Sequence, residues 1–201
     1  MIALLIAAAA TAATPLDAER AFAADAQKLG QWTAFAKWSA DDAQMFVPQL
    51  VNAHAFLKGR EDPPVAVFWW PTTSFVSCDG TTAINTGPWV RDGGRSVGYF
   101  TTVWQRQTDG SWKWVYDGGD GLKQIAAEGK EAAVRTASCA GKAAPDSGGP
   151  PDPAHGKKSS ADGTLAYRWT VDADGSRAFK AFLFNGTDYE LVLDQKVAAP
   201  K

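Results

Sequence analysis

The sequence is poor in the side chains from which metal and redox sites are built. Two histidines and two cysteines occur in 201 residues, and their spacing matches neither a zinc set nor a C-x-x-C motif. P-loop and dinucleotide-binding fingerprints are also missing. We therefore predict no bound metal and no cofactor.

Positive charge and long apolar runs are equally scarce. The formal net charge is −2 and the isoelectric point is near 5.7, which argues against nucleic acid as a partner because such binding needs a basic surface. After residue 13, no stretch approaches the ~18 apolar residues of a membrane-spanning helix. Stable membrane insertion is therefore not expected.

The N-terminal residues have the pattern of a secretory signal. Residues 2–13 carry no charge and end in small residues with an A-x-A pattern, Ala10-Thr11-Ala12. Cleavage near Ala12 or Ala13 would release an exported protein, periplasmic or secreted. The alternative is that residues 1–13 form the alanine-rich start of the first helix.

The two cysteines are consistent with export. In an oxidising compartment Cys78 and Cys139 can form one disulfide that closes a long loop and stabilises the fold by roughly 2–4 kcal/mol. Two buried free thiols are the alternative.

Hydrophobic periodicity divides the chain into a helical first part and a β-rich remainder. The spacing of apolar side chains predicts helix over residues 16–38, with a break at Gly30, and a short helix over 53–58. A turn is expected at 39–42. Strands are predicted over residues 44–47, 65–77, 81–90, 96–107 and 112–117. Helices packed on such an antiparallel meander form an α+β domain.

The last third of the chain differs in composition. Residues 141–163 are rich in Gly, Pro and Ser, so they are expected to form a linker or long loop between a main domain, 14–140, and an extension, 164–201. Three strands are predicted in the extension, over 164–171, 177–184 and 189–197. Because this segment is too short to fold alone, we expect it to pack on the main sheet or on another subunit.

Several motifs between residues 18 and 119 resemble those of the nuclear transport factor 2-like superfamily, close to its SnoaL-like, ketosteroid isomerase-like and domain-of-unknown-function members. The motifs are FAKW (35–38), ADDA (40–43), TGPW (86–89), GYFTTVW (98–104) and DGSWKW (109–114). The resemblance implies a cystatin-like cone, in which a strongly curved antiparallel sheet wraps around the N-terminal helices and encloses an apolar cavity. The superfamily includes isomerases, dehydratases, cyclases and non-catalytic binding domains, so the fold does not decide the function.

The catalytic positions of ketosteroid isomerase-like members are not retained. The resemblance places the family's tyrosine, its carboxylate base and its second acid at Ala23, Val47 and Thr102. Alanine and valine carry no titratable group, and threonine is a poor acid. Steroid isomerase chemistry is therefore not expected.

The resemblance also predicts which side chains contact a ligand in the cavity. These are Trp32, Trp70, Trp89, Phe100, Thr102, Trp104 and Val115. Strand alternation then places Trp112, Trp114 and Tyr116 on the outer face of the sheet, through which superfamily members often dimerise. A structural role in the core is the alternative for Trp32 and Trp70, as it is for Trp69.

Two polar residues are candidates for proton transfer. Asp117, on the inner face of an apolar cone, would have a pKa raised by desolvation and could act as a general base or as a hydrogen-bond anchor. Alternatively, it caps the turn at Gly118-Gly119. His54 could line the cavity mouth, or it could be a structural histidine.

Two functions remain open from the sequence. The first is an exported, non-catalytic module that binds a small apolar or aromatic molecule and forms a homodimer through the outer sheet face. The second is a small-molecule isomerase, dehydratase or cyclase in which Asp117, with His54, transfers protons. The missing acid–base set favours the first.

Overall fold

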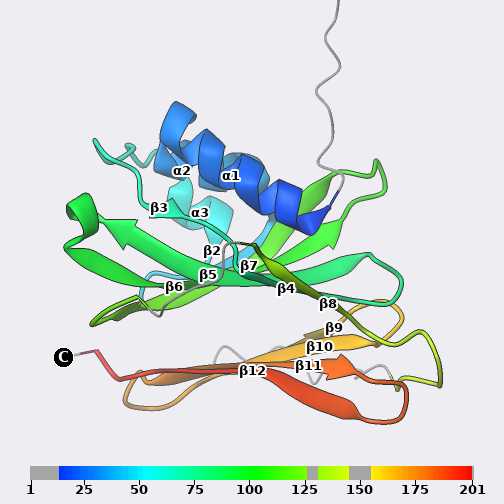
Figure 1. The fold of residues 1–201 in the computed structure, drawn as a ribbon. Coiled ribbons are helices and arrows are strands. Elements are labelled where there is room, and N and C mark those ends of the chain that lie inside the picture. Colours follow the sequence, from blue (N-terminus) through cyan, green and yellow to red (C-terminus); the bar gives the residue numbers. More distant parts are fainter. Residues whose placement is uncertain (1–13, 126–130, 145–154, 201) are drawn as a thin grey trace, which may run out of the picture.

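The structure, a computed structural model, describes residues 14–125, 131–144 and 155–200. A layer of helices, a large curved sheet and a second, smaller sheet are stacked on one another (Figure 1). The predicted signal peptide and residues 145–154 of the predicted linker lie outside the described residues.

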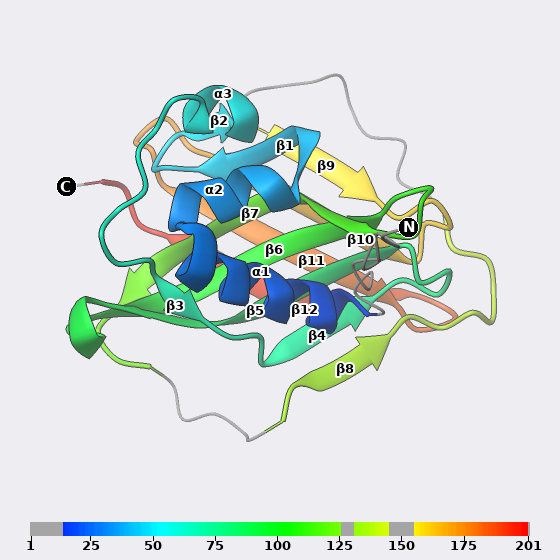
Figure 2. The same ribbon diagram turned by 90° about the horizontal axis from the view of Figure 1, so that it is seen from above.

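The helices cover the inner face of the large sheet (Figure 2). α1 (Pro15–Leu29) begins with a capping box, in which Thr14 and Asp17 exchange hydrogen bonds between their side chains and backbones. α2 (Gln31–Trp38) follows a break at Gly30, whose φ of 109° favours glycine. The short helix α3 (Ala53–Leu57) comes later in the chain. The predictions of helix over 16–38 with a break at Gly30, and over 53–58, are confirmed.

The large sheet has the strand order β2-β1-β7-β6-β5-β4-β8, with β3 paired to β5. Its strands are β1 (Ser39–Phe46), β2 (Leu50–Asn52), β3 (Phe68–Trp69), β4 (Thr73–Val76), β5 (Thr82–Arg91), β6 (Ser96–Arg106), β7 (Trp112–Leu122) and β8 (Ala133–Thr136), and the turn η1 (Asp92–Gly94) joins β5 to β6. Most neighbours are antiparallel, whereas β1 runs parallel to β7 and β4 parallel to β8. Apolar side chains of α1, α2 and the inner face form one core.

Four features of this sheet differ from the sequence prediction. β1 begins at Ser39, where a turn was expected, because residues 39–46 pair with the edge of β7. The predicted strand 65–77 is divided into β3 and β4 around Pro71, which has no N–H to donate. β7 continues to Leu122, beyond the expected end at Asp117. β2 and β8 were not predicted.

The second sheet consists of β9 (His155–Ser159), β10 (Leu165–Val171), β11 (Arg177–Phe184) and β12 (Tyr189–Val197), in the order β12-β11-β10-β9. The three predicted strands are confirmed. The fourth, β9, lies within residues 141–163, where the polar composition predicted a linker. Paired to β10, this edge strand keeps an exposed and half-buried surface, so its sequence carries no apolar alternation.

The second sheet packs on the outer face of the large sheet. Side chains of the two sheets form a second core, including Ile84, Val103, Tyr116, Tyr167 and Phe179. The extension therefore packs on the main sheet of its own chain. It covers the face on which a second copy was expected, so a homodimer through that face would require the second sheet to leave.

The predicted disulfide between Cys78 and Cys139 is confirmed. It joins the residues that follow β4 to those that follow β8. Beside it, the backbone N–H of Ser138 donates to the carbonyl of Phe184 at the end of β11. The disulfide therefore ties two strand ends of the large sheet together, and the Ser138 hydrogen bond connects this corner to the second sheet.

Within the described ranges, no helix combines the length and the apolar character needed to cross a membrane.

Candidate functional site

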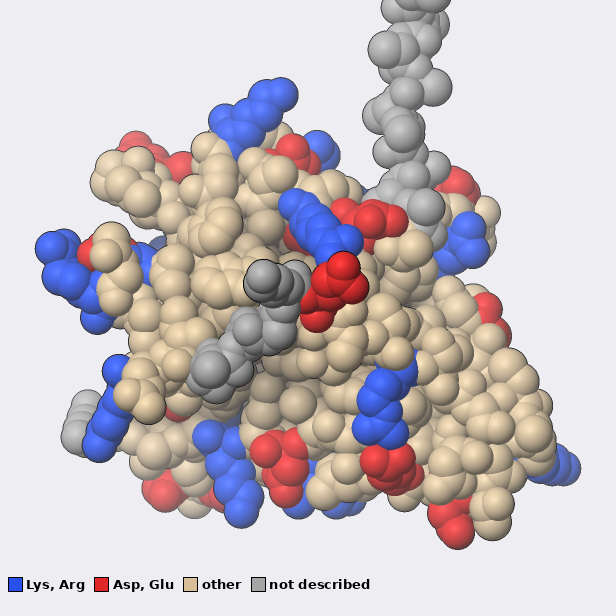
Figure 3. Space-filling view, viewed as in Figure 1, with Lys and Arg blue, Asp and Glu red and all other residues tan. Residues whose placement is uncertain are grey.

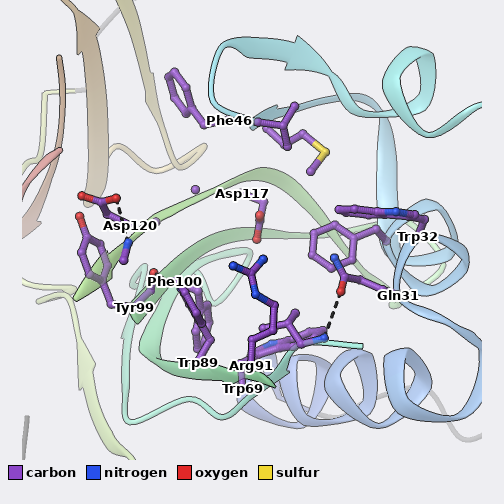
Figure 4. A pocket seen from close by; sticks show the side chains of 17 residues that line it. Gln31, Trp32, Phe46, Trp69, Trp89, Arg91, Tyr99, Phe100, Asp117 and Asp120 are labelled. Atoms are coloured by element: carbon purple, nitrogen blue, oxygen red, sulfur yellow. Dashed lines mark hydrogen bonds between the residues drawn. The ribbon is translucent and has the colours of Figure 1, made fainter. Parts of the chain in front are cut away.

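A cavity of about 290 Å³ lies between α2 and the inner face of the large sheet and opens to the surface. Seven of the 17 lining residues are aromatic, and polar side chains are set among them (Figure 4). The lining comes from α2 (Gln31, Trp32, Phe35), β1 and the following residue (Met45, Phe46, Val47), the segment up to β3 (Val67, Trp69), β5 (Trp89, Arg91), β6 (Tyr99, Phe100) and residues 117–121 of β7.

Two tryptophans of the cavity wall are held by contacts with neighbouring residues. Trp32 packs edge-on against Phe35 and Phe56, with ring centroids 5.6 and 6.0 Å apart. The indole N–H of Trp89 donates to the carbonyl of Tyr99 at 3.0 Å. These contacts hold the side chains of both tryptophans in place.

Asp117 is the carboxyl at the inner part of this cavity. It lies on β7 opposite Thr102 of β6, and the Thr102 hydroxyl donates to its Oδ2 at 3.2 Å. Burial, which is the largest influence, and the nearby charge of Glu19 raise the pKa of Asp117 to about 8. The hydrogen bond from Thr102 opposes this rise. Asp117 is therefore mostly protonated at neutral pH, although the cavity reaches its side chain.

Glu19 of α1 is a second buried carboxyl, which the sequence analysis missed. It is fully inaccessible to solvent, and it accepts hydrogen bonds from Trp69 Nε1 at 2.8 Å, Trp104 Nε1 at 2.6 Å and Asn85 Nδ2 at 3.3 Å. Burial raises the pKa of Glu19 to about 7, and these hydrogen bonds limit the rise. A signal for it exists in the sequence, because Glu19 lies three residues after Leu16 and four before Ala23, on the apolar face of the helix.

Charged and polar side chains also stand at the rim. Arg91 extends from β5 at the cavity opening (Figure 4) and forms an ion pair with Asp92 at 3.5 Å. Tyr99 lies at the same end, and burial with the charge of Asp120 raises its pKa to about 12. Elsewhere on the face in Figure 3, charges of both signs are interspersed.

Of the seven predicted ligand contacts, three line the cavity and two lie directly beneath the lining. Trp32, Trp89 and Phe100 line the cavity, as does Asp117. Thr102 and Trp104 lie beneath the lining, where they contact Asp117 and Glu19 respectively.

Two further predicted residues lie away from the cavity. Trp70 is outside the lining and packs against Phe68, with ring centroids 5.6 Å apart. His54 is also outside the lining: its Nε2 lies 3.1 Å from the hydroxyl of Ser39. The structure therefore does not bring His54 and Asp117 together.

The assignment of faces along β7 was partly wrong. Val115 belongs to the core between the two sheets, whereas Trp112 and Trp114 lie in the core beneath the helices; only Tyr116 has the predicted outer position. The cause is a β-bulge, because Val103 pairs with Tyr116 while the next residue, Trp104, pairs with Trp114. Val115 is the extra residue, and it breaks the alternation on which the prediction depended.

The positions that the resemblance matched to the isomerase acids hold no acid. Ala23 is buried in the core beneath the helices, and Val47 lines the cavity. Thr102 takes part only through its hydroxyl. The carboxyls present, Glu19 and Asp117, come from other positions.

Residues 94–98, GRSVG, have the G-x-S-x-G spacing of a hydrolase nucleophile motif. That motif requires a sharp turn between a strand and a helix. Here the segment ends the turn between β5 and β6, and the hydroxyl of Ser96 donates to Asp92 at 3.1 Å. Its location does not support a nucleophilic role.

The part of the chain described by the structure contains no group of three or more His, Cys, Asp or Glu side chains able to hold a metal ion.

Solved structures resemble this chain over about half its length. A candidate ketosteroid isomerase from Parabacteroides distasonis is 17% identical, with a TM-score of 0.44, and the match covers 55% of this chain and 89% of that one. A nuclear transport factor 2-like superfamily protein from Salmonella enterica is 12% identical, with a TM-score of 0.40, over 56% of this chain and 91% of its own. The CaMKII hub of S. rosetta is 22% identical, with a TM-score of 0.40, over 55% and 98%. No family model and no curated protein matches the sequence. The structure itself confirms the predicted fold class, in which N-terminal helices cover one face of a large, curved and mostly antiparallel sheet.

Proposed function

We propose that this protein binds a small, largely aromatic molecule in the cavity between α2 and the large sheet, with Asp117 as its polar anchor. The observation that carries the proposal is the carboxyl of Asp117, which lines the same cavity as the rings of Trp32, Trp89 and Phe100. Small-molecule sites are typically concave and apolar, with a few polar groups that orient the ligand.

We also propose that binding takes place outside the cytoplasm. The bond between Cys78 and Cys139 supports this, because disulfides persist mainly in oxidising compartments. The apolar, A-x-A-terminated residues 2–13 point the same way.

A direct test is to fill the cavity. Val67 lines it, whereas Val65 of the same segment is 72% exposed and outside it. Binding of one-ring aromatic compounds, followed by ligand-observed NMR, should weaken about tenfold or more in Val67→Trp and stay unchanged in Val65→Trp. Equal binding by both variants would place the ligand elsewhere.

The raised pKa of Asp117 favours a second candidate, proton-transfer catalysis of an isomerase, dehydratase or cyclase type. A general base works best when its pKa lies near the working pH. Asp117→Asn separates the two functions. A binding protein should keep most of its affinity, because an amide still donates a hydrogen bond, whereas an enzyme should lose ~10²–10⁴ in turnover.

A further inference from the structure

Thr102 links two carboxyl groups that come from different layers of the molecule. Its hydroxyl donates to Asp117 of β7 at 3.2 Å, and the same hydroxyl also acts on Glu19 of α1, where it lowers the pKa of that carboxyl. A hydroxyl has only one hydrogen. Thr102 can therefore donate to one carboxyl at a time, and the two protonation states are connected through it.

The other partners of Glu19 are donors. The indole N–H groups of Trp69 and Trp104 cannot accept a hydrogen bond. The side-chain amide of Asn85 is also a donor to Glu19. Its orientation is fixed, because its Nδ2 donates to the carbonyl of Pro15 at 2.9 Å as well as to Glu19. An ionised carboxylate is the form of Glu19 that accepts from all three.

Asp117 has a much poorer set of partners. In the described part of the chain, its carboxyl has a hydrogen bond from Thr102, and the cavity borders it otherwise. A half-buried carboxylate with one donor is disfavoured, whereas a neutral carboxyl can donate to the Thr102 oxygen or to a ligand. The hydrogen-bond partners thus favour the ionised form of Glu19 and the neutral form of Asp117.

We infer that Glu19 holds the negative charge of this pair and Asp117 holds the proton, so that the cavity offers a hydrogen-bond donor to an uncharged aromatic ligand that carries an acceptor such as a carbonyl oxygen. The ligand class rests on the proposed function, whereas the location of the proton does not. Glu19 is in this sense a positioning residue, since it acts on the ligand only through Asp117.

The other charged groups around the cavity do not replace Glu19 in this role. Arg91 of β5 is exposed and paired with Asp92. Asp120 of β7 is at the rim and accepts from the N–H of Gly121 at 2.8 Å. Tyr99 of β6 stays neutral at ordinary pH, because its pKa is about 12. Burial raises the pKa of both carboxyls, and more hydrogen bonds oppose the rise at Glu19 than at Asp117, in agreement with these hydrogen-bond partners.

The proton can be located by NMR titration of the full chain labelled with ¹³C at the carboxyl groups of Asp and Glu. Asp117→Asn identifies the Asp117 signal. We expect Asp117 to titrate near pH 8 in the unmodified chain. Titration of Asp117 near its ordinary pKa of about 4 would overturn the inference.

Three variants test whether Glu19 and Thr102 set this value. Glu19→Gln removes the neighbouring charge and should lower the pKa of Asp117 by about one unit or more. Thr102→Val should remove the coupling between the titrations of Asp117 and Glu19. Thr102→Ser, which keeps the hydroxyl, should preserve that coupling. A purely structural role for Glu19 would leave the Asp117 titration unmoved, and that result would contradict the inference. If Glu19→Gln does not fold, the titrations of Thr102→Val, Thr102→Ser and the unmodified chain still test the inference.

The ligand class is tested with two probes of similar size, acetophenone and phenyltrimethylammonium. Acetophenone should bind at about pH 6 and weaken about tenfold by about pH 9, where Asp117 has lost its proton. The cation should show the opposite trend. A pH-independent affinity for acetophenone, or a preference for the cation at pH 6, would overturn the ligand class. Failure of both probes to bind would overturn it together with the proposed function, whereas an unshifted Asp117 titration would overturn the proton placement alone.

Discussion

At the residue scale, Glu19 combines a structural role with an electrostatic one. Its carboxyl satisfies two indole N–H groups and one amide in a region without access to water. Each of these donors would lose its partner if the carboxyl were removed, and an unsatisfied buried donor costs about 1–3 kcal/mol. Glu19 is therefore needed for the stability of the fold around the site as well as for its electrostatic effect on Asp117.

Glu19→Ala should lower the free energy of unfolding by about 3 kcal/mol or more, because it leaves buried donors unpaired and opens a cavity. Urea denaturation followed by tryptophan fluorescence measures this change. Glu61→Ala is the matched control: Glu61 is exposed, and its removal should cost less than about 0.5 kcal/mol. Similar losses in both variants would refute the structural role of Glu19.

The same two carboxyls predict how stability depends on pH. The pKa values of Glu19 and Asp117 in the folded chain, about 7 and 8, lie above their ordinary values of 4.5 and 3.8. The folded protein therefore binds more protons than the unfolded chain between about pH 4 and pH 8, and the free energy of unfolding falls as pH rises through this range. One pKa unit corresponds to about 1.4 kcal/mol, so the loss between pH 5.5 and 8.5 should be on the order of a few kcal/mol.

Denaturation series at these two pH values measure this loss. Carboxyls with lowered pKa values, such as Asp25 and Asp62, change their contribution only at lower pH. In Asp117→Asn most of the dependence should disappear. A stability that is constant or rises between pH 5.5 and 8.5 would show that the two groups are not buried as described.

At the element scale, α2 depends on a cap from outside the helix. Its N-cap residue is Gly30, which has no side chain, and Asp62 takes over the function: Oδ1 accepts from the backbone N–H groups of Trp32 at 2.5 Å and Thr33 at 3.1 Å. The hydroxyl of Thr33, which donates to Oδ2 at 2.6 Å, is the main cause of a lowered pKa of Asp62, and the two backbone hydrogen bonds add to it. Because Trp32 lines the cavity, the cap also fixes one wall of the site.

Asp62→Ala should destabilise the chain by about 1 kcal/mol, as is typical for the loss of a helix cap. It should also broaden the indole NMR signal of Trp32, because the first turn of α2 loses its anchor. The exposed Asp188 provides the control variant, Asp188→Ala, in which the Trp32 signal should remain sharp. A sharp Trp32 signal in Asp62→Ala would mean that packing alone holds the helix.

Elements with a strong local pattern were predictable from the sequence, and elements set by pairing were not. Gly30 marked the helix break, and Asp-Gly turns marked the long strands. β9 and β8 have no apolar alternation of their own, so they become strands only through β10 and β4. The same distinction holds for the site: Trp32, Trp89, Phe100 and Asp117 were predicted, whereas Glu19 needs its distant partners to explain its burial.

At the scale of the whole molecule, the second sheet covers the outer face of the large sheet, where a second copy was expected to bind. The outer face of the large sheet carries Ile84, Val103 and Tyr116, and the chain covers it with β10 and β11. An exposed apolar face of this kind would associate with another copy. We therefore expect a monomer at micromolar concentration, as measured by analytical ultracentrifugation.

A charge between the sheets should reverse this behaviour. Ala181 of β11 is fully buried there, whereas Ala166 of β10 is only half-buried and lines a pocket on the other side of the sheet. Ala181→Asp should destabilise the chain by about 3 kcal/mol or more and promote self-association, while Ala166→Asp should do neither. A stable, monomeric Ala181→Asp variant would show that the sheets do not need this contact.

Because of the bulge at Val115, Asp117 also helps to determine the register between β6 and β7. β6 and β7 are the longest strands, with 11 residues each, and they have a competing alignment in which Val115 pairs normally. In that alignment every side chain of β7 beyond Val115 changes sides, and Asp117 enters the apolar layer around Tyr167 and Phe179. An unpaired carboxyl there is penalised by several kcal/mol. The group that we propose to anchor the ligand therefore disfavours a misaligned hairpin, so a change at Asp117 that suits a new ligand would also weaken the fidelity of folding.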